Sequence, residues 1–398
     1  MPKNRFRGKI AIAGIGEVPT GKYPERDCIE SAVIVAKEAI NDAGIKKDDI
    51  DVIMPTGTIF SRHVNTDLAL SRLAEELGLN YRLKDNIQVF NGGSSSSTMV
   101  KVAGGLILAG LAKVILCIQC DKLATGININ EAIDLFATLG IYEEFEVPYG
   151  FNFSAVAGLV TQRYMYETGT TSEEIASVCV SNRKWAELNP NAMFRKPLTI
   201  GEVLSSKMLS TPLHAKESNV LADGAAAFIV TSWEYAKEIT KTPVAILGTG
   251  SVVTHYSLAQ ELDITRFGFS KASKEAHEMA GITSEDIDIA EIYDSYPVFQ
   301  LITLEELGLC ERGTAGKFVY EGNTWPSGVM PMTTNGGMLS QGHTGAGGGF
   351  AIFVEAVRQL MRKAGERQVK DCTIAIETST GGTYMDSHVT ILGTKESV

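Results

Sequence analysis

The chain has 398 residues, of which 44% are hydrophobic and 21% are charged. This balance is usual for a globular protein with a sizeable core, and the length fits two or three domains or one large duplicated unit. The formal net charge of −11 argues against a general nucleic-acid surface and against an anionic-membrane surface. A local basic patch for an anionic ligand is still compatible with this charge.

The six cysteines are scattered through apolar segments. Cys117 and Cys120 form a C-x-x-C, but they lie inside the apolar run 114–120, so we interpret both as buried strand residues rather than a redox or zinc site. The N-terminus leads into a strand instead of an apolar signal segment, and no apolar run approaches the roughly 18 residues of a membrane span. We therefore expect a reduced, cytoplasmic protein that carries no metal of its own.

An apolar strand that ends in Gly-x-Gly occurs twice, at residues 9–16 and 243–250. A stronger match follows it, because segments 37–51 and 274–288 align without a gap and share nine of fifteen residues. Each segment predicts a helix closed by a C-terminal glycine, then a turn into a strand. The general similarity of α/β proteins does not explain so long a match, which indicates an internal duplication.

Two further correspondences keep the same order along the chain. The turn Asn91-Gly-Gly is repeated as Asn335-Gly-Gly, and each precedes an apolar helix rich in small residues. After these helices, a predicted strand at 113–118 matches one at 371–376. Each half therefore follows the pattern β-α-β-α-β, which predicts a mostly parallel sheet with helices on its faces.

The duplication divides the chain into three parts. The N-terminal half comprises residues 1–120 together with 221–242, and the C-terminal half comprises residues 243–398. Residues 121–220 have no counterpart in the second half, so we interpret them as an inserted loop domain. We predict a helix near 155–166 within it, preceded by aromatic residues that form either a lid over a ligand or a small satellite core.

Two glycine-rich turns in the first and second halves carry groups suited to catalysis. The turn that starts at Asn91 lies between a predicted strand at 87–90 and a helix, so its free backbone N–H groups can hold an anion, a thiolate or a developing oxyanion. Ser94 also fits simple helix capping, and both roles stay open for it. In the second half, His343 lies among glycines that let a ligand approach the backbone, and it titrates near neutrality. We therefore expect His343 to be functional.

Two more turns should reach the same edge of the sheet. Gly381 and Gly382 follow the last predicted strand of the repeat and can offer a second set of backbone N–H groups to an oxyanion. The turn after the strand near 289–292 places the phenol of Tyr293 and the carboxyl of Asp294 there. His214 and His255 have no motif around them, and we interpret both as structural.

Four motifs together are similar to those of one known family: Asp223-Gly-Ala-Ala-Ala, Asn189-Pro-Asn-Ala, Gly342-His-Thr-Gly-Ala-Gly and Tyr293-Asp-Ser-Tyr. They resemble the thiolase superfamily, in particular its sterol-carrier-protein-type and archaeal branches, over essentially the whole chain. The resemblance implies a five-layered αβαβα sandwich with the inserted loop domain covering coenzyme A. It also implies coenzyme A as a substrate and a homodimer built through edge strands.

The chain departs from the family at its two cysteines. The nucleophilic cysteine aligns with Gly93, or with Ser94 if the register shifts by one, and the second cysteine falls on Ser379 or Thr380. The histidine of the family's H-D-C-F motif is Tyr293 here, whereas the histidine of the glycine-rich loop is kept as His343. An acyl-cysteine cannot form, but His343 and the backbone N–H groups near Gly93 and Gly382 can still stabilise a thioester enolate.

These departures leave two reactions on an acyl-CoA. In the first, the thiol of coenzyme A attacks a β-keto group directly; in the second, Tyr293 deprotonates a β-hydroxyl and the Cα–Cβ bond breaks by retro-aldol cleavage. The chain resembles cysteine-less members of both kinds, the thiolase-like subunit of 2-benzoylsuccinyl-CoA thiolase and the steroid side-chain aldolases. The kept His343 favours thiolysis, because the steroid aldolases have a tyrosine there. A non-catalytic subunit that binds coenzyme A is a third alternative.

The resemblance also implies binding partners and phosphate contacts. Relatives of this kind work with a small partner that contains a zinc finger and an OB fold, so zinc is expected only in the partner. Arg183, Lys184, Arg195 and Lys196 lie in the part that resembles the family's CoA-binding loop domain, and we predict them as phosphate contacts. Any one of them is equally compatible with ordinary surface charge.

Overall fold

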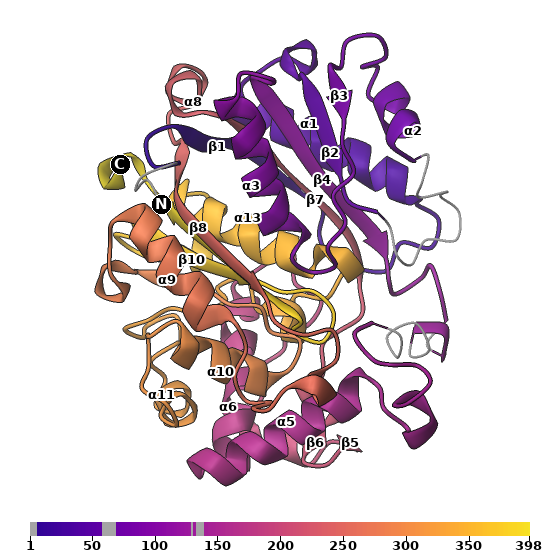
Figure 1. Cartoon of the computed structure of the whole chain (residues 1–398), viewed down its shortest axis with the longest axis vertical. Coiled ribbons are helices and arrows are strands. Elements are labelled where there is room, and N and C mark those ends of the chain that lie inside the picture. Colours follow the sequence, from indigo (N-terminus) through magenta and orange to yellow (C-terminus); the bar gives the residue numbers. More distant parts are fainter. Residues whose placement is uncertain (1–5, 58–68, 129, 133–138) are drawn as a thin grey trace.

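The computed structural model describes residues 6–57, 69–128, 130–132 and 139–398 (Figure 1). The first half contains β1 (Ile10–Glu17), α1 (Cys28–Ala43), β2 (Val52–Pro55), α2 (Ala69–Glu76), β3 (Asp85–Asn86), α3 (Ser95–Leu108), β4 (Val114–Lys122), β7 (Asp223–Ser232) and α8 (Trp233–Ile239). Between β4 and β7 the chain forms α5 (Phe153–Thr168), α6 (Ser172–Glu187), α7 (Ile200–Leu204) and the hairpin strands β5 (Met208–Ser210) and β6 (Leu213–His214).

The second half repeats the plan of the first and adds short helices to it. Its elements are β8 (Val244–Val253), α9 (Phe269–Ala280), β9 (Ile289–Glu291), α10 (Pro297–Glu306), α11 (Ala315–Tyr320), α12 (Gly337–Ser340), α13 (Gly348–Leu360), β10 (Ile374–Ser379) and β11 (Asp386–Gly393). α12 and a short 3₁₀ turn separate the Asn335-Gly-Gly turn from α13, whereas α3 begins directly after Asn91-Gly-Gly. The additional loop contains His343.

The strands follow the order β3-β2-β4-β7-β1 in the first half and β8-β11-β10-β9 in the second. A two-residue pairing of β1 with β8 joins the halves, between Ala11 and Ala245 and between Ile12 and Val244. Strand β2 runs parallel to β3 and β4, and β9 runs parallel to β10. The prediction of a mostly parallel sheet is wrong, because β7 and β11 pair antiparallel with both of their neighbours. β11 follows β10 through a tight turn, which requires the reverse direction.

The layers are those predicted, α-β-α-β-α. Helix α1 covers the outer face of the first half-sheet, and α9 covers the outer face of the second. Helices α3 and α13 pack on each other and contact strands of both half-sheets, so they form the central layer (Figure 1). In β1, Ile10 and Ile12 belong to the core around α3 and α13, whereas Ala11 and Ala13 belong to the outer core. Strands covered on both faces have continuous apolar sequences for this reason.

The fifteen-residue repeat has the same structural role in both halves. Gly44 and Gly281 end α1 and α9 in the left-handed conformation, each with a φ of 70°. Asp51 then accepts the backbone N–H groups at the start of β4, from Lys113 at 2.6 Å and Val114 at 3.1 Å. In the second half, Asp288 accepts the equivalent N–H groups of Thr373 at 2.7 Å and Ile374 at 2.9 Å. These contacts explain why both aspartates are kept.

One predicted strand differs in detail from the structure. The strand predicted at 87–90 is regular only at Asp85–Asn86, although the N–H groups of Ile87 and Val89 still bond to the carbonyls of Ile53 and Pro55. Cys117 and Cys120 are buried in β4 as predicted, and they face opposite cores because their spacing is odd. Among the described residues, no helix is long and apolar enough to cross a membrane.

The repeated Gly-x-Gly allows each outer helix to lie directly on its strand. A Cβ on Gly250 would collide with the backbone carbonyl of Ala272 in α9. We therefore expect Gly250→Ala to lower the free energy of unfolding by about 1–3 kcal/mol through overpacking. Gly105, in α3, has no atom within 4 Å of the equivalent point. Gly105→Ala should therefore raise the free energy of unfolding by up to about 1 kcal/mol.

Urea unfolding of both variants at one pH measures this difference. Equal effects of the two substitutions would show that glycine is not required for close packing in β8.

Candidate active site

The glycine-rich turns of the two halves meet around one small cavity. It lies at the N-terminus of α3, where the start of that helix approaches the ends of β9 and β10 and the loop before α13. The residues that line it are Gly92, Gly93, Leu139, Phe153, Asn219, Tyr293, His343, Gly345, Ala346 and Gly382. The structure thus brings together four of the five predicted catalytic positions.

His343 is held by its own backbone and by the loop around it. Its N–H donates to the carbonyl of Val220 at 2.6 Å, and its carbonyl accepts the N–H of Ala222 at 2.9 Å. The N–H of Gly345 donates to Nδ1 at 3.2 Å, so the ring proton resides on Nε2. Burial lowers the pKa of His343 to about 4. The expectation that His343 titrates near neutrality is therefore corrected: the imidazole is neutral at pH 7 and presents Nε2–H as a hydrogen-bond donor.

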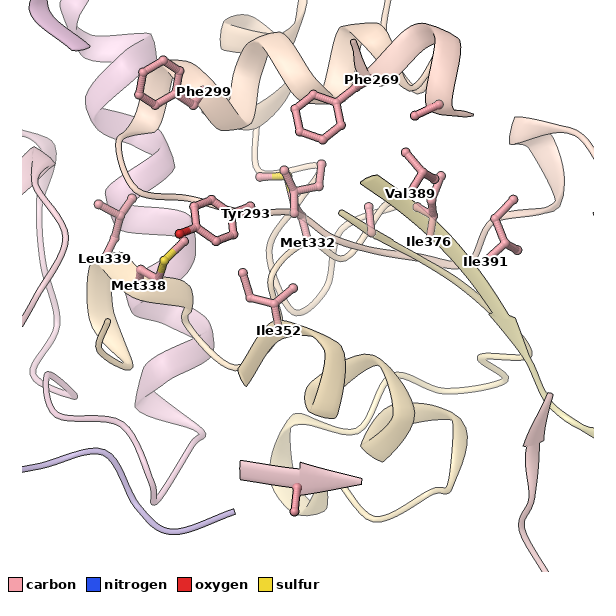
Figure 2. Close-up of a cluster of buried hydrophobic side chains, with 14 of the residues drawn as sticks. Phe269, Tyr293, Phe299, Met332, Met338, Leu339, Ile352, Ile376, Val389 and Ile391 are labelled. Carbon is pink, nitrogen blue, oxygen red and sulfur yellow. The ribbon is translucent and has the colours of Figure 1, made fainter. Parts of the chain in front are cut away.

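The hydroxyl of Tyr293 lies 3.4 Å from Nε2 of His343. Its ring packs edge-on against Tyr384, with centroids 6.1 Å apart, and its N–H donates to the side chain of Thr378 at 3.1 Å. Figure 2 shows the ring within the buried hydrophobic cluster and its oxygen directed toward Met338. Burial raises the pKa of Tyr293 well above the usual range of a phenol, so the hydroxyl keeps its proton.

Tyr293 also explains why position 93 has no side chain. A Cβ on Gly93 would lie 2.5 Å from the Tyr293 hydroxyl and 2.5 Å from the carbonyl oxygen of Thr380. Such contacts are far inside van der Waals distance, so both the Tyr293 hydroxyl and the Thr380 backbone exclude a side chain at position 93.

Gly382 places a further donor at the cavity. Its φ of 52° lies in the left-handed region, which favours glycine. Its N–H makes no hydrogen bond to any described residue. Gly92 of the first-half turn packs against this backbone, since a Cβ on it would lie 3.6 Å from the nitrogen of Gly382. The Gly382 N–H is available to a bound ligand.

Ser94 lies outside this cavity. It precedes α3 and is fully buried. Its hydroxyl lies 2.8 Å from Oδ2 of Asp386 and 2.7 Å from the carbonyl of Asn91. Both contacts tie the turn to the protein behind it, so the structure does not bring Ser94 together with the other predicted catalytic residues.

Asp294, next to Tyr293, holds the second-half turn. Its carboxyl accepts the N–H groups of Met338 at 2.8 Å and Leu339 at 3.1 Å, and the side-chain amide of Asn182 at 2.7 Å. Full burial raises the pKa of Asp294 to about 8. These contacts fix the orientation of the turn that follows Asn335.

A larger cavity of about 560 Å³ adjoins the first. The two share Phe153 and Asn219, and none of the described residues that line the larger cavity carries a charged side chain. The polar groups in it are neutral, and one pair is the Tyr296 hydroxyl with the Ser154 hydroxyl at 2.7 Å. The lining residues are Ala132, Gly150, Asn152, Phe153, Ser154, Ala155, Leu209, Ser210, Ser218, Asn219, Leu221 and Tyr296.

The structure brings three of the four predicted phosphate contacts near one another. Arg183 on α6 donates to the Lys196 carbonyl at 2.9 Å and to the Ser340 hydroxyl at 3.0 Å. Arg195 and Lys196 are both exposed. Lys184 instead packs over the ring of Trp325, 4.3 Å from its centroid.

Two residues that shape the site, Asn219 and Asp386, were not predicted. Asn219 lies near the end of the inserted segment, where no repeat or motif marks it, whereas Phe153 is one of the aromatic residues of that segment for which a lid was considered. Asp386 contacts both glycine-rich turns, and its only sequence signal is its position four residues after Gly382. Within the described ranges, no group of three or more His, Cys, Asp or Glu side chains is arranged to hold a metal ion.

Comparison with known proteins agrees with this architecture. A family model described as thiolase C-terminal domain-like matches residues 250–394. The benzoylsuccinyl-CoA thiolase subunit BbsB of Thauera aromatica is 30% identical over 386 residues, which are 95% of this chain and 96% of that protein. A steroid side-chain-cleaving aldolase of Thermomonospora curvata is 30% identical over 400 residues, covering 97% and 98% of the two chains.

Solved structures show the same relationship. The Ltp2-ChsH2(DUF35) aldolase superposes with a TM-score of 0.86 at 27% identity, covering 98% of each chain. Human mitochondrial 3-ketoacyl-CoA thiolase, at 16% identity and a TM-score of 0.74, shares the fold. The chain belongs to the thiolase superfamily and is a thiolase-type enzyme whose relatives include both acyltransferases and aldolases.

Proposed function

We propose that this enzyme cleaves or forms the Cα–Cβ bond of a substituted β-ketoacyl-CoA by direct attack of coenzyme A, without an acyl-enzyme. The observation that carries the proposal is the pairing of Tyr293 and His343 in a cavity where Gly93 replaces the nucleophile. Two proton donors thus face the space in which a thioester would react. Among the described residues, no cysteine lines either cavity, which supports a nucleophile supplied by a substrate.

In this reaction the sulfur of coenzyme A attacks the β-carbonyl carbon, and the Cα–Cβ bond then breaks to release an enolate. Nε2–H of His343 and the N–H of Gly382 donate to the thioester oxygen, where the enolate charge develops. As the sulfur attacks, Tyr293 gives its proton to the β-carbonyl oxygen and takes the proton of the thiol. When the Cα–Cβ bond breaks, Tyr293 takes the proton back from that oxygen and gives its own to Cα. Because its pKa is raised, the phenol acts as a donor and is not left as a stable phenolate.

Retro-aldol cleavage of a β-hydroxyacyl-CoA is the second candidate. The similarity to the Ltp2-ChsH2 aldolase over 98% of the chain favours it. The same three donors serve this reaction, since the hydroxyl proton passes through Tyr293 to Cα and the same enolate is released. The two reactions differ in whether coenzyme A is consumed. A non-catalytic role fits less well, because the donors remain assembled.

The larger cavity suits the pantetheine arm of coenzyme A. This arm carries neutral amides, and the described residues that line the cavity offer neutral hydroxyl and amide groups. Arg183, Arg195 and Lys196 supply positive charge for the phosphates. Lys184 is a weaker candidate, because its ammonium lies over Trp325.

We also infer a partner subunit. The relatives include a protein named as a subunit, BbsB, and a complex named Ltp2-ChsH2. We propose a small zinc-finger and OB-fold protein in this role, with zinc held in the partner, around a homodimer of this chain.

One experiment separates the two reactions. The chain is co-expressed with a genomic neighbour that carries a C-x-x-C zinc motif. The complex then receives a β-keto and a β-hydroxy acyl-CoA with the same acyl chain, with and without free coenzyme A. We expect cleavage of the β-keto compound only when coenzyme A is present. If only the β-hydroxy compound is cleaved, and without coenzyme A, the enzyme is an aldolase and the proposed thiolysis is wrong.

His343→Ala should lower kcat roughly 10²- to 10³-fold, as expected for the loss of one oxyanion donor. His343→Gln offers an amide N–H in a similar place and should recover part of this loss. Steady-state kinetics with the active substrate measure both variants. Wild-type kcat in His343→Ala would contradict the donor role.

Tyr293→Phe should lower kcat about 10²- to 10⁴-fold, because it removes a proton-transferring group and keeps the ring that packs in the core. Tyr164→Phe is the matched control. Tyr164 is also a buried phenol, and it bonds to Glu305 at 2.6 Å outside both cavities. Equal activities of the two variants would exclude Tyr293 from the chemistry.

The neutral state of His343 predicts a pH-dependent stability. Its pKa is about 4 in the folded protein, against about 6.5 in the unfolded chain. Between these values the unfolded state binds more protons, so the free energy of unfolding falls as the pH drops. Wild type should lose roughly 2 kcal/mol more than His343→Gln between pH 7 and pH 5. Urea unfolding at both pH values measures this, and identical losses would show an exposed or charged histidine.

A further inference from the structure

Asp386 contacts the glycine-rich turns of both halves. It begins β11 and is 4% exposed. Its Oδ1 accepts the N–H of Gly381 in the second-half turn at 2.6 Å. Its Oδ2 accepts the hydroxyl of Ser94 and the amide of Asn91 in the first-half turn, each at 2.8 Å. One carboxylate therefore bonds to two turns that are almost 300 residues apart in sequence.

Few side chains are available at this junction to fix the spacing of the turns. A Cβ on Gly381 would lie 2.8 Å from the Asn91 carbonyl, and a Cβ on Gly92 would lie 3.4 Å from Cα of Gly381. The two turns thus meet backbone to backbone, where glycine provides close approach but no interlocking shape. Hydrogen bonds have to supply the alignment that packing does not.

The chemistry of an ionised carboxylate suits this task. It accepts several hydrogen bonds at once, and bonds to a charged acceptor are about twice as strong as neutral ones. Nε2 of His388 lies 3.2 Å from Oδ2 and adds a third partner on that oxygen. Burial raises the pKa of Asp386, but the hydrogen bonds and the charge of His388 hold the pKa below its usual value.

We propose that Asp386 is a positioning residue that aligns the Gly382 N–H with Gly93 and Tyr293 by locking the two turns together. Gly382 directly follows the Gly381 N–H that Asp386 holds. Tyr293 lies against Gly93, two residues before the start of α3. The carboxylate touches no lining group itself and acts through the turns. This inference rests on the proposed function, because it assigns the alignment of that site's oxyanion donors.

Asp386→Ala should lower kcat roughly 10²-fold, the effect expected when reacting groups are misplaced by about 1 Å. KM for the acyl-CoA should stay within about threefold, because the larger cavity is not altered. Asp386→Asn keeps a carbonyl oxygen for the Gly381 N–H and should recover at least about tenfold of the lost kcat. A purely structural role would not produce this recovery or this separation of kcat from KM.

Asp288→Asn is the matched control. Asp288 also accepts two backbone N–H groups at a strand end, but it lies at the opposite end of β10 from the active site. This variant should lower stability and leave kcat within about twofold. A kcat loss equal to that of Asp386→Asn would overturn the proposal, since it would reflect general loosening of the sheet.

Ser94→Ala removes one bond to Asp386 without removing the carboxylate, and it keeps the inference testable if Asp386→Ala does not fold. It should lower kcat by about three- to tenfold. In the Asp386→Asn background the same change should have a smaller effect, because the two residues act through one contact. Complete loss of turnover in Ser94→Ala, with an acyl-serine adduct in wild type by intact mass, would overturn the proposal.

Amide hydrogen exchange of the peptide 378–386 measures how firmly Asp386 holds the second-half turn, and it does not depend on turnover. The peptide should exchange at least about tenfold faster in Asp386→Ala than in wild type, whereas peptides of α9 should be unchanged. If the wild-type complex cleaves neither acyl-CoA but the peptide exchanges faster in Asp386→Ala, the proposed function is wrong and the role of Asp386 in holding the two turns is supported. Unchanged exchange and unchanged kcat in Asp386→Ala would overturn the proposal that Asp386 aligns the two turns.

Discussion

The packing of α3 against α13 is the contact on which the rest of the structure depends. Each helix belongs to one half of the duplication, and each follows a glycine-rich turn. Because both lie in the central layer between the half-sheets, their N-terminal turns converge on the same cavity. A small-residue helix surface permits this approach, and backbone N–H groups at the helix starts create a site for developing negative charge.

Within that arrangement, the proposed chemistry rests on the close contact between Gly93 and Tyr293. The Tyr293 hydroxyl lies 2.5 Å from the point where a Cβ on Gly93 would stand, so a proton donor occupies the space beside this turn. The neutral imidazole of His343 supplies a second donor. In the proposed function these donors stabilise an enolate, and the attack, or the release of a ketone, is left to the substrates.

A relative named as a thiolase subunit and a relative named as an aldolase both align with nearly the whole chain. This is understandable if the enolate is the common intermediate, because the protein contacts needed for it do not depend on how the β-carbon reacts. The specificity then lies in what fills the space beyond Tyr293 and in whether coenzyme A can enter together with the acyl group. The inserted segment, which contributes Phe153 to both cavities, is the part of the chain placed to control this.

The sequence by itself determined the duplication, the five layers and the family, and it predicted four positions that line the smaller cavity. Gly-x-Gly strands, the repeated helix-turn-strand segment and the loop around His343 are local patterns, and each has a local physical cause such as a left-handed cap or a close helix contact. The strand directions of β7 and β11 were decided by how the chain returns to the sheet, which local patterns do not record. Only the tertiary structure decided that Ser94 faces Asp386 instead of the cavity and that Tyr293 fills the space at Gly93. These contacts join residues about 200 to 300 positions apart, so their geometry arises only when the two halves pack together.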